Sequence, residues 1–288
     1  MTEDGAIHSF LSDDGNNNDR EVIDSFGCEW KKFSAFSEEE IMRTGREYFD
    51  LIDDKILNRN SVVLDIGCGS GRFTKYISPK VSFVEAIDPS ESVFTAKSFL
   101  NSESNVRVTQ ADIDHIPFPD DAFDFIFCLG VLHHVSETQA ALKKCVEKLK
   151  PGGHFLIYLY YDLDDRGRTF KALLFAVNLC RRFICKLPPI LKNLACDFIS
   201  LVVYLPLAFL CRAMLKIPHI NSVAKFFPLY YYHNKTYRIM RNDALDRFGT
   251  SVEKRYTKAQ IQQILLEAKL KDISFSPNMP FWHAVGRK

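Results

Sequence analysis

Short apolar runs alternate with segments of helical spacing through the middle of the chain. Runs that are rich in β-branched residues and end at a charge or a glycine predict strands buried on both faces of a sheet. Their alternation with helices predicts an α/β fold with a mostly parallel sheet. Seven strands are expected, at residues 62–64, 81–87, 106–112, 123–128, 154–159, 272–275 and 281–286.

The remaining segments carry helix signals or signs of disorder. Capping-box patterns at Ser37 and Thr257 each predict the start of a helix. Residues 1–20 are rich in Asp, Asn, Ser and Gly, which is typical of a mobile tail. The expected divisions are the tail (1–20), an aromatic strap with a helix (21–60), a core (61–162), an inserted helical cap (163–245) and a closing helix with two strands (246–288).

The inserted segment is both basic and apolar. Residues 166–225 contain ten Lys and Arg but one acid, Asp197, so this segment carries +9 and the rest of the chain −8. Two or three amphipathic helices are expected here. Prolines should break them, at Pro188–Pro189, Pro206 and Pro218. The uncharged run 198–211 has 14 residues, fewer than the about 17–25 that a membrane span needs.

Three interpretations of this insertion stay open. It is a helical cap with solvated lysines, a platform that touches an anionic membrane or a lipid-linked substrate, or a transmembrane hairpin. The helical cap is the preferred interpretation, followed by the platform and then by the hairpin. Binding to liposomes with and without anionic lipid separates them.

Composition narrows the class of protein. The chain has 288 residues, is 47% apolar and 25% charged, and carries a net charge of +1, so it lacks the basicity typical of nucleic-acid binding. Its eight cysteines show no C-x-x-C pair or other metal-ligand spacing, which predicts no metal site and favours a reducing cytoplasm. The first residues lack the basic and apolar regions of a signal peptide. We expect a cytoplasmic location, with membrane association if residues 166–225 touch a bilayer.

A glycine-rich loop carries the clearest chemistry. The run 61–71 reads Ser-Val-Val-Leu-Asp-Ile-Gly-Cys-Gly-Ser-Gly, a strand followed by three alternating glycines. Glycine permits a sharp turn and close approach of a ligand, and a helix start beyond it favours a nucleotide-type group. Asp88 ends the next strand 23 residues after Asp65, where an acid accepts hydrogen bonds from ribose hydroxyls. An NAD site, another nucleoside site and a glycine turn without a ligand all stay open here.

Further phrases distinguish these alternatives. The glycine register departs from G-x-G-x-x-G, and the chain goes on with Pro-Phe-Pro-Asp at 117–120, Leu-His-His at 132–134 and Leu-Lys-Pro-Gly-Gly at 149–153. An FG-x-x-W segment precedes them at 26–30. In this order the motifs resemble class I S-adenosylmethionine (SAM)-dependent methyltransferases, of the bacterial small-molecule type. The resemblance implies a Rossmann-like sheet of seven strands whose last strand is antiparallel.

The resemblance also implies the cofactor and its site. In the family the glycine loop lies against the methionyl part of SAM, the acid after the second strand binds the ribose, and the acid after the third strand binds adenine. Carried over to this sequence, the cofactor-binding residues are Asp65, Gly67, Cys68, Gly69, Gly71, Asp88, Pro89, Asp112, Ile113, Leu129 and Gly130.

Methyl transfer needs little from the protein beyond alignment, because the sulfonium supplies the reactive methyl group. A hydroxyl acceptor usually needs a base, and His133 and His134 are the candidates. Similar enzymes sometimes pair such a histidine with an acid near the end of the fifth strand, but here Tyr158–Tyr161 occupy that region and Asp162 follows. Both histidines equally suit packing.

The function expected from these residues is SAM-dependent methyl transfer to an O or N of a small or lipid-linked acceptor. The alternatives are an NAD(P)-dependent oxidoreductase and a non-catalytic module that binds SAM or a nucleoside. A nucleic-acid acceptor is not expected, because no N/D-P-P-Y/F tetrapeptide is present. The sequence leaves the acceptor and the oligomeric state open.

Overall fold

The computed structural model describes residues 7–11, 20, 22–24, 26–27, 36–224 and 226–288. The chain forms two compact units, one made of Met1–Asp165 with Val252–Lys288 and the other of Arg166–Ser251. The boundary expected at residue 245 therefore falls within a helix of the second unit, α10 (Tyr237–Gly249).

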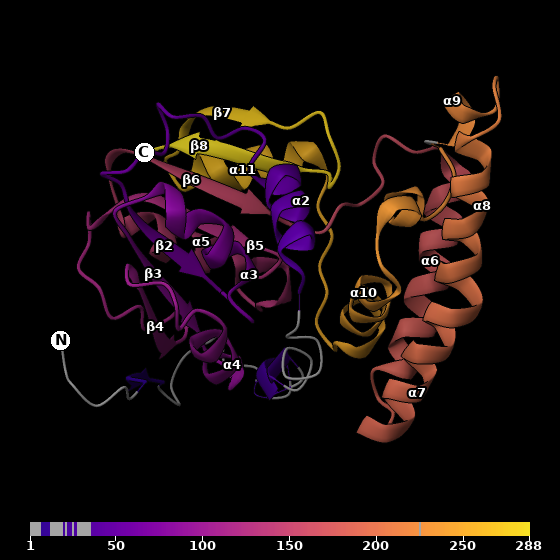
Figure 1. Cartoon of the computed structure of the whole chain (residues 1–288), viewed down its shortest axis with the longest axis horizontal. Helices are drawn as coiled ribbons and strands as arrows, with labels where there is room; N and C mark the ends of the chain where they lie inside the picture. The colour runs from indigo at the N-terminus through magenta and orange to yellow at the C-terminus, as the bar shows by residue number, and fades with distance from the viewer. Residues whose placement is uncertain (1–6, 12–19, 21, 25, 28–35, 225) are drawn as a thin grey trace. The chain divides into compact units, whose positions relative to one another are not determined.

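The first unit contains the sheet (Figure 1). Its strands are β1 (Ser9–Phe10), β2 (Val62–Ile66), β3 (Phe83–Asp88), β4 (Val106–Ala111), β5 (Phe123–Leu129), β6 (Leu149–Tyr158), β7 (Lys271–Phe275) and β8 (His283–Arg287). Its helices are α2 (Glu38–Tyr48), α3 (Arg72–Ile77), η1 (Ser78–Lys80), α4 (Ser92–Phe99), η2 (Leu132–His134), α5 (Thr138–Glu147) and α11 (Lys258–Glu267).

The strand order is β1-β4-β3-β2-β5-β6-β8-β7. Strands β1 to β6 pair in parallel, and β8 runs antiparallel to both β6 and β7. The α/β class and the antiparallel last strand are confirmed. The sheet has eight strands rather than seven, because Ser9 and Phe10, placed in the expected tail, pair with Gln110 and Ala111 of β4.

Successive residues of the central strands pack on opposite faces of the sheet, as a pleated strand requires. Leu64 and Ile126 join the core on the side of α5 and α11. Val63 and Phe125 join the core on the side of α2 and α3. Complete burial of such side chains contributes about 1.5–3 kcal/mol each, so both faces of β2 and β5 hold the sheet edge rigid.

Strand β6 begins earlier than the pattern indicated. The phrase Pro151-Gly152-Gly153 was expected to precede the strand, but it lies inside β6, next to a register shift against β5. Gly152 has φ +81°, and Gly153 has no room for a Cβ beside the Asp124 carbonyl. The irregularity therefore accommodates a proline and two glycines that an even ladder would disfavour.

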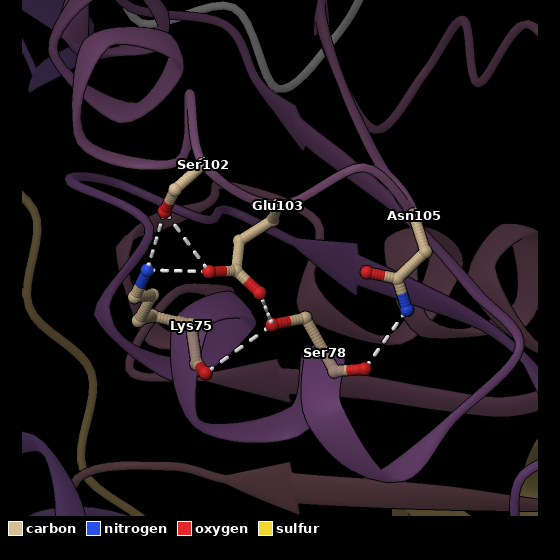
Figure 2. Close-up of polar contacts among 5 residues, drawn as sticks. All are labelled: Lys75, Ser78, Ser102, Glu103 and Asn105. Atoms are coloured by element: carbon tan, nitrogen blue, oxygen red, sulfur yellow. Dashed lines mark hydrogen bonds and ion pairs between the residues drawn. The ribbon is translucent and has the colours of Figure 1, made fainter.

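A polar cluster fixes the helix that follows the glycine loop (Figure 2). Glu103 accepts hydrogen bonds from Lys75 and, at 2.8 Å, from Ser78 Oγ. Asn105 Nδ2 donates to the Ser78 carbonyl at 2.8 Å. The bond from Lys75 is the main cause that lowers the pKa of Glu103. These contacts tie α3 and η1 to the α4–β4 connection, so the start of α3 is held in place.

The second unit is helical. Its elements are α6 (Arg168–Ile184), α7 (Pro189–Ile199), the π-helical turn η3 (Ser200–Tyr204), α8 (Leu205–Leu215), α9 (Asn221–Ala224), η4 (Tyr230–Asn234) and α10. The backbone stays helical from α7 through α8.

The expected break at Pro206 is wrong. Proline lacks an N–H and its ring collides with the carbonyl four residues earlier in an α-helix. Here the Leu205 N–H bonds to the Ser200 carbonyl, five residues back, and this wider turn accommodates the ring. The break at Pro188–Pro189 is present, with Pro189 as the first residue of α7. By length and composition alone, the 27-residue helix Pro189–Leu215 could cross a membrane.

Candidate functional site

The glycine loop joins β2 to α3 in a conformation that glycine permits. Gly67, Gly69 and Gly71 have φ of +76°, +53° and +83°. A Cβ on Gly67 would lie 2.3 Å from Val131 Cγ2, and one on Gly71 would lie 2.7 Å from Leu100 Cδ1. The backbone therefore passes close to its neighbours, and N–H groups of Gly67 and Cys68 donate to the Ile87 carbonyl at 2.8 and 3.0 Å.

Asp65 lies at the carboxyl end of β2 and is buried. Its Oδ2 accepts a hydrogen bond from Thr74 Oγ1 of α3 at 2.5 Å. Burial raises the pKa of Asp65 to about 8, and the charge of Asp88 adds to the increase while Thr74 opposes it. The contact that the structure gives Asp65 is therefore with α3, where it anchors the helix behind the loop.

Asp88 ends the neighbouring strand and holds the loop from the other side. Its Oδ2 accepts from the Gly69 N–H at 2.9 Å, and its Oδ1 accepts from the N–H and Oγ of Ser90 at 2.9 and 2.6 Å. The adjacent Pro89 carbonyl accepts from Gln110 Nε2 at 3.2 Å. A carboxylate has about four lone-pair positions, so Asp88 retains capacity to accept a further hydrogen bond.

The other predicted cofactor residues lie after β4 and β5. Asp112 is buried directly after β4, and its Oδ1 accepts from the His115 N–H at 2.8 Å. Ile113 beside it is buried. Leu129 ends β5, and Gly130 follows with φ +81° and no atom within 4 Å of the position of a Cβ. The structure thus brings the loop and both acids to the carboxyl edge of adjacent parallel strands, as predicted.

This edge is also a topological switch point. The chain passes from β2 to β3 on one side of the sheet and returns to β5 on the other side of β2. In open α/β sheets, ligands bind outside the carboxyl ends of strands at such a point. The glycine loop lies at the end of β2 and therefore in the middle of this region.

Two observations test whether a cofactor fits the loop. Ser70 Oγ is buried and finds no hydrogen-bond partner among the described residues, so a ligand hydroxyl or amine would satisfy it. Open space adjoins Gly130. Cys68 is buried, and burial raises the pKa of its thiol, which suits a packing role. In the part of the chain that the structure describes, no three His, Cys, Asp or Glu side chains form a group that could hold a metal ion.

His133 and His134 lie in η2, next to the end of β5. The His133 ring is fully buried and stacks on Tyr160 with ring centres 3.8 Å apart. Burial, then the charges of His134 and Arg255, lower the pKa of His133, so it is neutral. His134 Nδ1 lies 2.7 Å from the Val252 carbonyl. A carbonyl only accepts, so Nδ1 carries the proton and Nε2 has the lone pair.

Sequence reasoning missed the segment that lies beside these histidines. The Lys254 N–H donates to the His133 carbonyl at 2.9 Å, and the Tyr256 N–H donates to the Tyr160 carbonyl at 2.8 Å. Glu253 and Arg255 form a buried ion pair at 2.7 Å, and Arg255 lies 5.5 Å from the Tyr160 ring centre. An acid near the histidines is thus present in this segment, at Glu253, but the contact that the structure gives it is with Arg255.

The FG-x-x-W segment at 26–30 belongs to the aromatic strap that is expected within residues 21–60. The Phe26 ring packs against the His134 ring at a tilt of 60°, with ring centres 4.8 Å apart, and a Cβ on Gly27 would lie 3.4 Å from Ser90 Cβ. These contacts are with a candidate base and with a residue next to the predicted cofactor residue Pro89. Trp30 lies outside the described residues.

Comparison with known proteins assigns this part of the chain to a class. Residues 64–157 match the sequence profile of the family described as "Methyltransferase domain". The chain is 32% identical over 138 residues to the uncharacterized methyltransferase YcgJ of Bacillus subtilis (strain 168), and the match covers 47% of this chain and 54% of that protein. It is 30% identical over 128 residues to the ubiquinone biosynthesis O-methyltransferase of Coxiella burnetii (strain Dugway 5J108-111), covering 44% and 52%.

A third relative, the tRNA U34 carboxymethyltransferase of Nautilia profundicola, is 32% identical over 112 residues, which cover 38% of this chain and 37% of that protein. The match spans about half the length of the first two relatives. Among solved structures, human N-acetylserotonin methyltransferase in complex with SAM has a TM-score of 0.53 at 17% identity, covering 91% of this chain and 56% of that one, which shows the shared fold.

The fold and the site together define a Rossmann-like α/β domain with a topological switch point at the carboxyl edge of its sheet. Residues 64–157 are, more particularly, similar to methyltransferase domains.

Proposed function

We propose that the chain transfers a methyl group from SAM to an oxygen or nitrogen of a small acceptor. One observation carries the proposal. The Gly67–Gly71 loop is locked by Asp88 at the switch point and leaves the buried Ser70 hydroxyl without a protein partner among the residues described. The family assignment of residues 64–157 supports the same chemistry.

Residues at the ends of three neighbouring strands would each bind a different part of the cofactor. The glycine loop would lie along the methionyl part, Asp88 would accept from the ribose hydroxyls, and Asp112 with Ile113 would bind adenine. Leu129 and Gly130 would pass beside the reacting methyl group. When bound, SAM supplies an electrophilic methyl, and the protein has to align the acceptor and exclude water.

The structure favours His134 over His133 as a base for a hydroxyl acceptor. The bond from Nδ1–H to Val252 fixes the His134 ring with Nε2 as its basic nitrogen. His133 is stacked and fully buried, which suits packing. A general base contributes about 10²–10⁴-fold to a rate, so the two histidines differ measurably if this proposal is right.

Titration of the cofactor tests the binding part. Calorimetry with SAM, S-adenosylhomocysteine and NAD should show heat for the first two and none for NAD; the reverse would support an oxidoreductase. Asp88→Asn should weaken binding of S-adenosylhomocysteine by about 10–100-fold, because hydrogen bonds to a charged group contribute about 1.5–3 kcal/mol. Asp120→Asn is the matched control, since Asp120 is exposed and lies far along the chain from the loop.

Transfer of labelled methyl tests the catalytic part. Labelled SAM with cell extract should place the label in a small molecule. Label in tRNA would contradict the proposed acceptor class, and no transfer of label would support a binding module.

Two histidine variants test the general base. His134→Gln should lower turnover by about 100-fold or more with unchanged cofactor affinity. His133→Phe, which keeps the stack on Tyr160, should retain turnover within a few-fold, and an equal loss in both variants would refute the assignment of the base.

We also propose a cytoplasmic location. Seven cysteines among the described residues are free, as expected for a reducing compartment. Fractionation of cells that produce the full chain is the direct test.

A further inference from the structure

Exposed apolar side chains concentrate in the helical unit. Among the described residues, eighteen of the twenty-three large apolar side chains that are exposed belong to Arg166–Ser251. Soluble surfaces rarely present apolar residues in such density without a partner. Seventeen of them extend along α6, along α7 and α8, and into the segment after α8, and the other, Tyr237, begins α10. They are Leu173, Phe175, Leu179, Phe183, Ile190, Leu191, Leu194, Phe198, Leu201, Val202, Val203, Phe209, Leu210, Ile217, Ile220, Val223, Phe226 and Tyr237.

One side of the long helix α7–α8 is already occupied by the unit's own core. Its buried residues repeat at helical spacing, at Cys196, Ser200, Tyr204, Ala208 and Cys211. Ser200 Oγ lies 3.1 Å from Tyr237 Oη, and the Tyr204 and Tyr232 ring centres are 5.0 Å apart. The helix is therefore held along its length, and the apolar side chains listed above lie on the sides that the protein leaves uncovered.

Basic residues gather at the two ends of these helices. Arg182 and Lys186 lie where α6 ends and α7 is about to begin, and both are exposed. Arg168 and Lys171 open α6, and Lys216 follows α8; these are exposed too. The guanidinium of Arg166 lies 5.8 Å from the Phe226 ring centre, which brings the start of α6 near the segment beyond α8. The middle of α6 is uncharged from residue 172 to 180, and residues 198–211 of the α7–α8 helix are uncharged too.

We infer that α6 to α8 form a platform that binds the surface of an anionic lipid bilayer. Phenylalanine and leucine side chains enter the boundary between headgroups and acyl chains, and the flanking Lys and Arg contact anionic headgroups. This arrangement is that of an interfacial amphipathic element, whose affinity combines buried apolar area with electrostatic attraction. The inference stands on the second unit alone and does not depend on methyl transfer.

The contacts favour a helix that lies on the bilayer over one that crosses it. Asp197 in α7 pairs with Arg241 of α10 through two bonds of 2.9 and 2.6 Å. Placing this pair in hydrocarbon would be costly. The helix of 27 residues extends about 40 Å, and its exposed apolar residues run from end to end, as for an axis parallel to the membrane.

Vesicle flotation with the full chain tests the platform. The protein should float with vesicles of phosphatidylcholine mixed with phosphatidylglycerol, and remain unbound with phosphatidylcholine alone or at high salt. Phe209→Ser should lower vesicle affinity about tenfold or more. The matched control is Phe94→Ser in α4 of the first unit, because Phe94 and Phe209 are 57% and 56% exposed.

A charge variant tests the electrostatic part. Lys171→Glu should lower the affinity by about 25-fold, since each basic residue near the surface contributes about fivefold and the change to Glu reverses one charge, which equals the loss of two. Lys143→Glu, on an exposed position of α5, should have little effect.

Each other result overturns the inference. Equal flotation with neutral and anionic vesicles, or no flotation with either, would show that the chain does not select an anionic bilayer. Equal losses of vesicle affinity in Phe94→Ser and Phe209→Ser would show that α6 to α8 are not the binding surface. If the chain binds no vesicles but forms a dimer that Phe209→Ser dissociates, the apolar surface binds a second copy of the chain. If the protein stays in cell membranes after extraction with salt and alkaline carbonate, the helix spans the membrane. Binding of S-adenosylhomocysteine, measured on every variant, should be unchanged, so failure here is separate from failure of the methyltransferase proposal.

Discussion

The carboxyl edge of the sheet and the helices α6 to α8 depart from the usual distribution of side chains in opposite directions. At the sheet edge, Asp65, Asp88 and Asp112 are buried, each with hydrogen-bond donors. On the helices, phenylalanines and leucines are exposed, whereas Ser200 and Asp197 make hydrogen bonds within the unit. Buried acids require built partners and exposed apolar faces require an external one. The acids at the sheet edge therefore have their partners within the fold. The exposed apolar surface of the helices favours a partner outside the chain.

The largest effect should come from filling the glycine loop. Gly67→Ala places a Cβ at φ +76° and against Val131, a strain of about 1–3 kcal/mol, and should weaken binding of S-adenosylhomocysteine about 100-fold by calorimetry. Gly167→Ala is the matched control, because Gly167 has φ −62° and no atom near its Cβ position. Normal binding by Gly67→Ala would show that the loop backbone is not the cofactor surface.

A smaller effect concerns how the buried acid Asp65 responds to pH. Its folded pKa is about 8, above the ordinary value of 3.8, so between these pH values the folded state holds a proton that the unfolded state has released. The free energy of unfolding should therefore fall as pH rises through this window, by up to about 1.4 kcal/mol per pH unit from this group. Urea unfolding of Asp65→Asn should show a flatter pH dependence than the parent chain, and parallel curves would contradict the assignment.

The smallest effect sharpens the contrast between the regions. Phe209→Ser should change the free energy of unfolding by less than about 0.5 kcal/mol, because an exposed side chain contributes little to the fold. Leu64→Ala, at a fully buried position, should lower it by about 2–5 kcal/mol. Urea unfolding of both variants measures the difference. A loss above 2 kcal/mol for Phe209→Ser would mean that its face is packed within the folded chain.

The local pattern of apolar residues, glycines and acids predicted much of the sheet and of its carboxyl edge. Strands β2 to β5 are rich in β-branched and aromatic residues, and the loop glycines, Asp88 and Asp112 come at or directly after strand ends, so the order of the strands places them at one edge of the sheet. Three features depend on contacts that no local pattern encodes. Ser9 and Phe10 pair with β4 across about a hundred residues, Pro206 is accommodated by a π-helical turn, and the Lys254 backbone bonds to His133 from beyond the inserted unit.

The points where the chain leaves and re-enters the first unit are fastened to each other. Tyr161 forms a β-bridge with Tyr256, and the Asp162 N–H donates to the Tyr256 carbonyl at 3.1 Å. The Asp164 carboxylate accepts from the Lys258 N–H and from Trp282 Nε1. The 86 residues of the second unit are therefore inserted between two segments that the first unit itself holds together. An insertion at such a point leaves the sheet and its glycine loop in place, so a domain of this kind can gain a new binding surface without rebuilding its core.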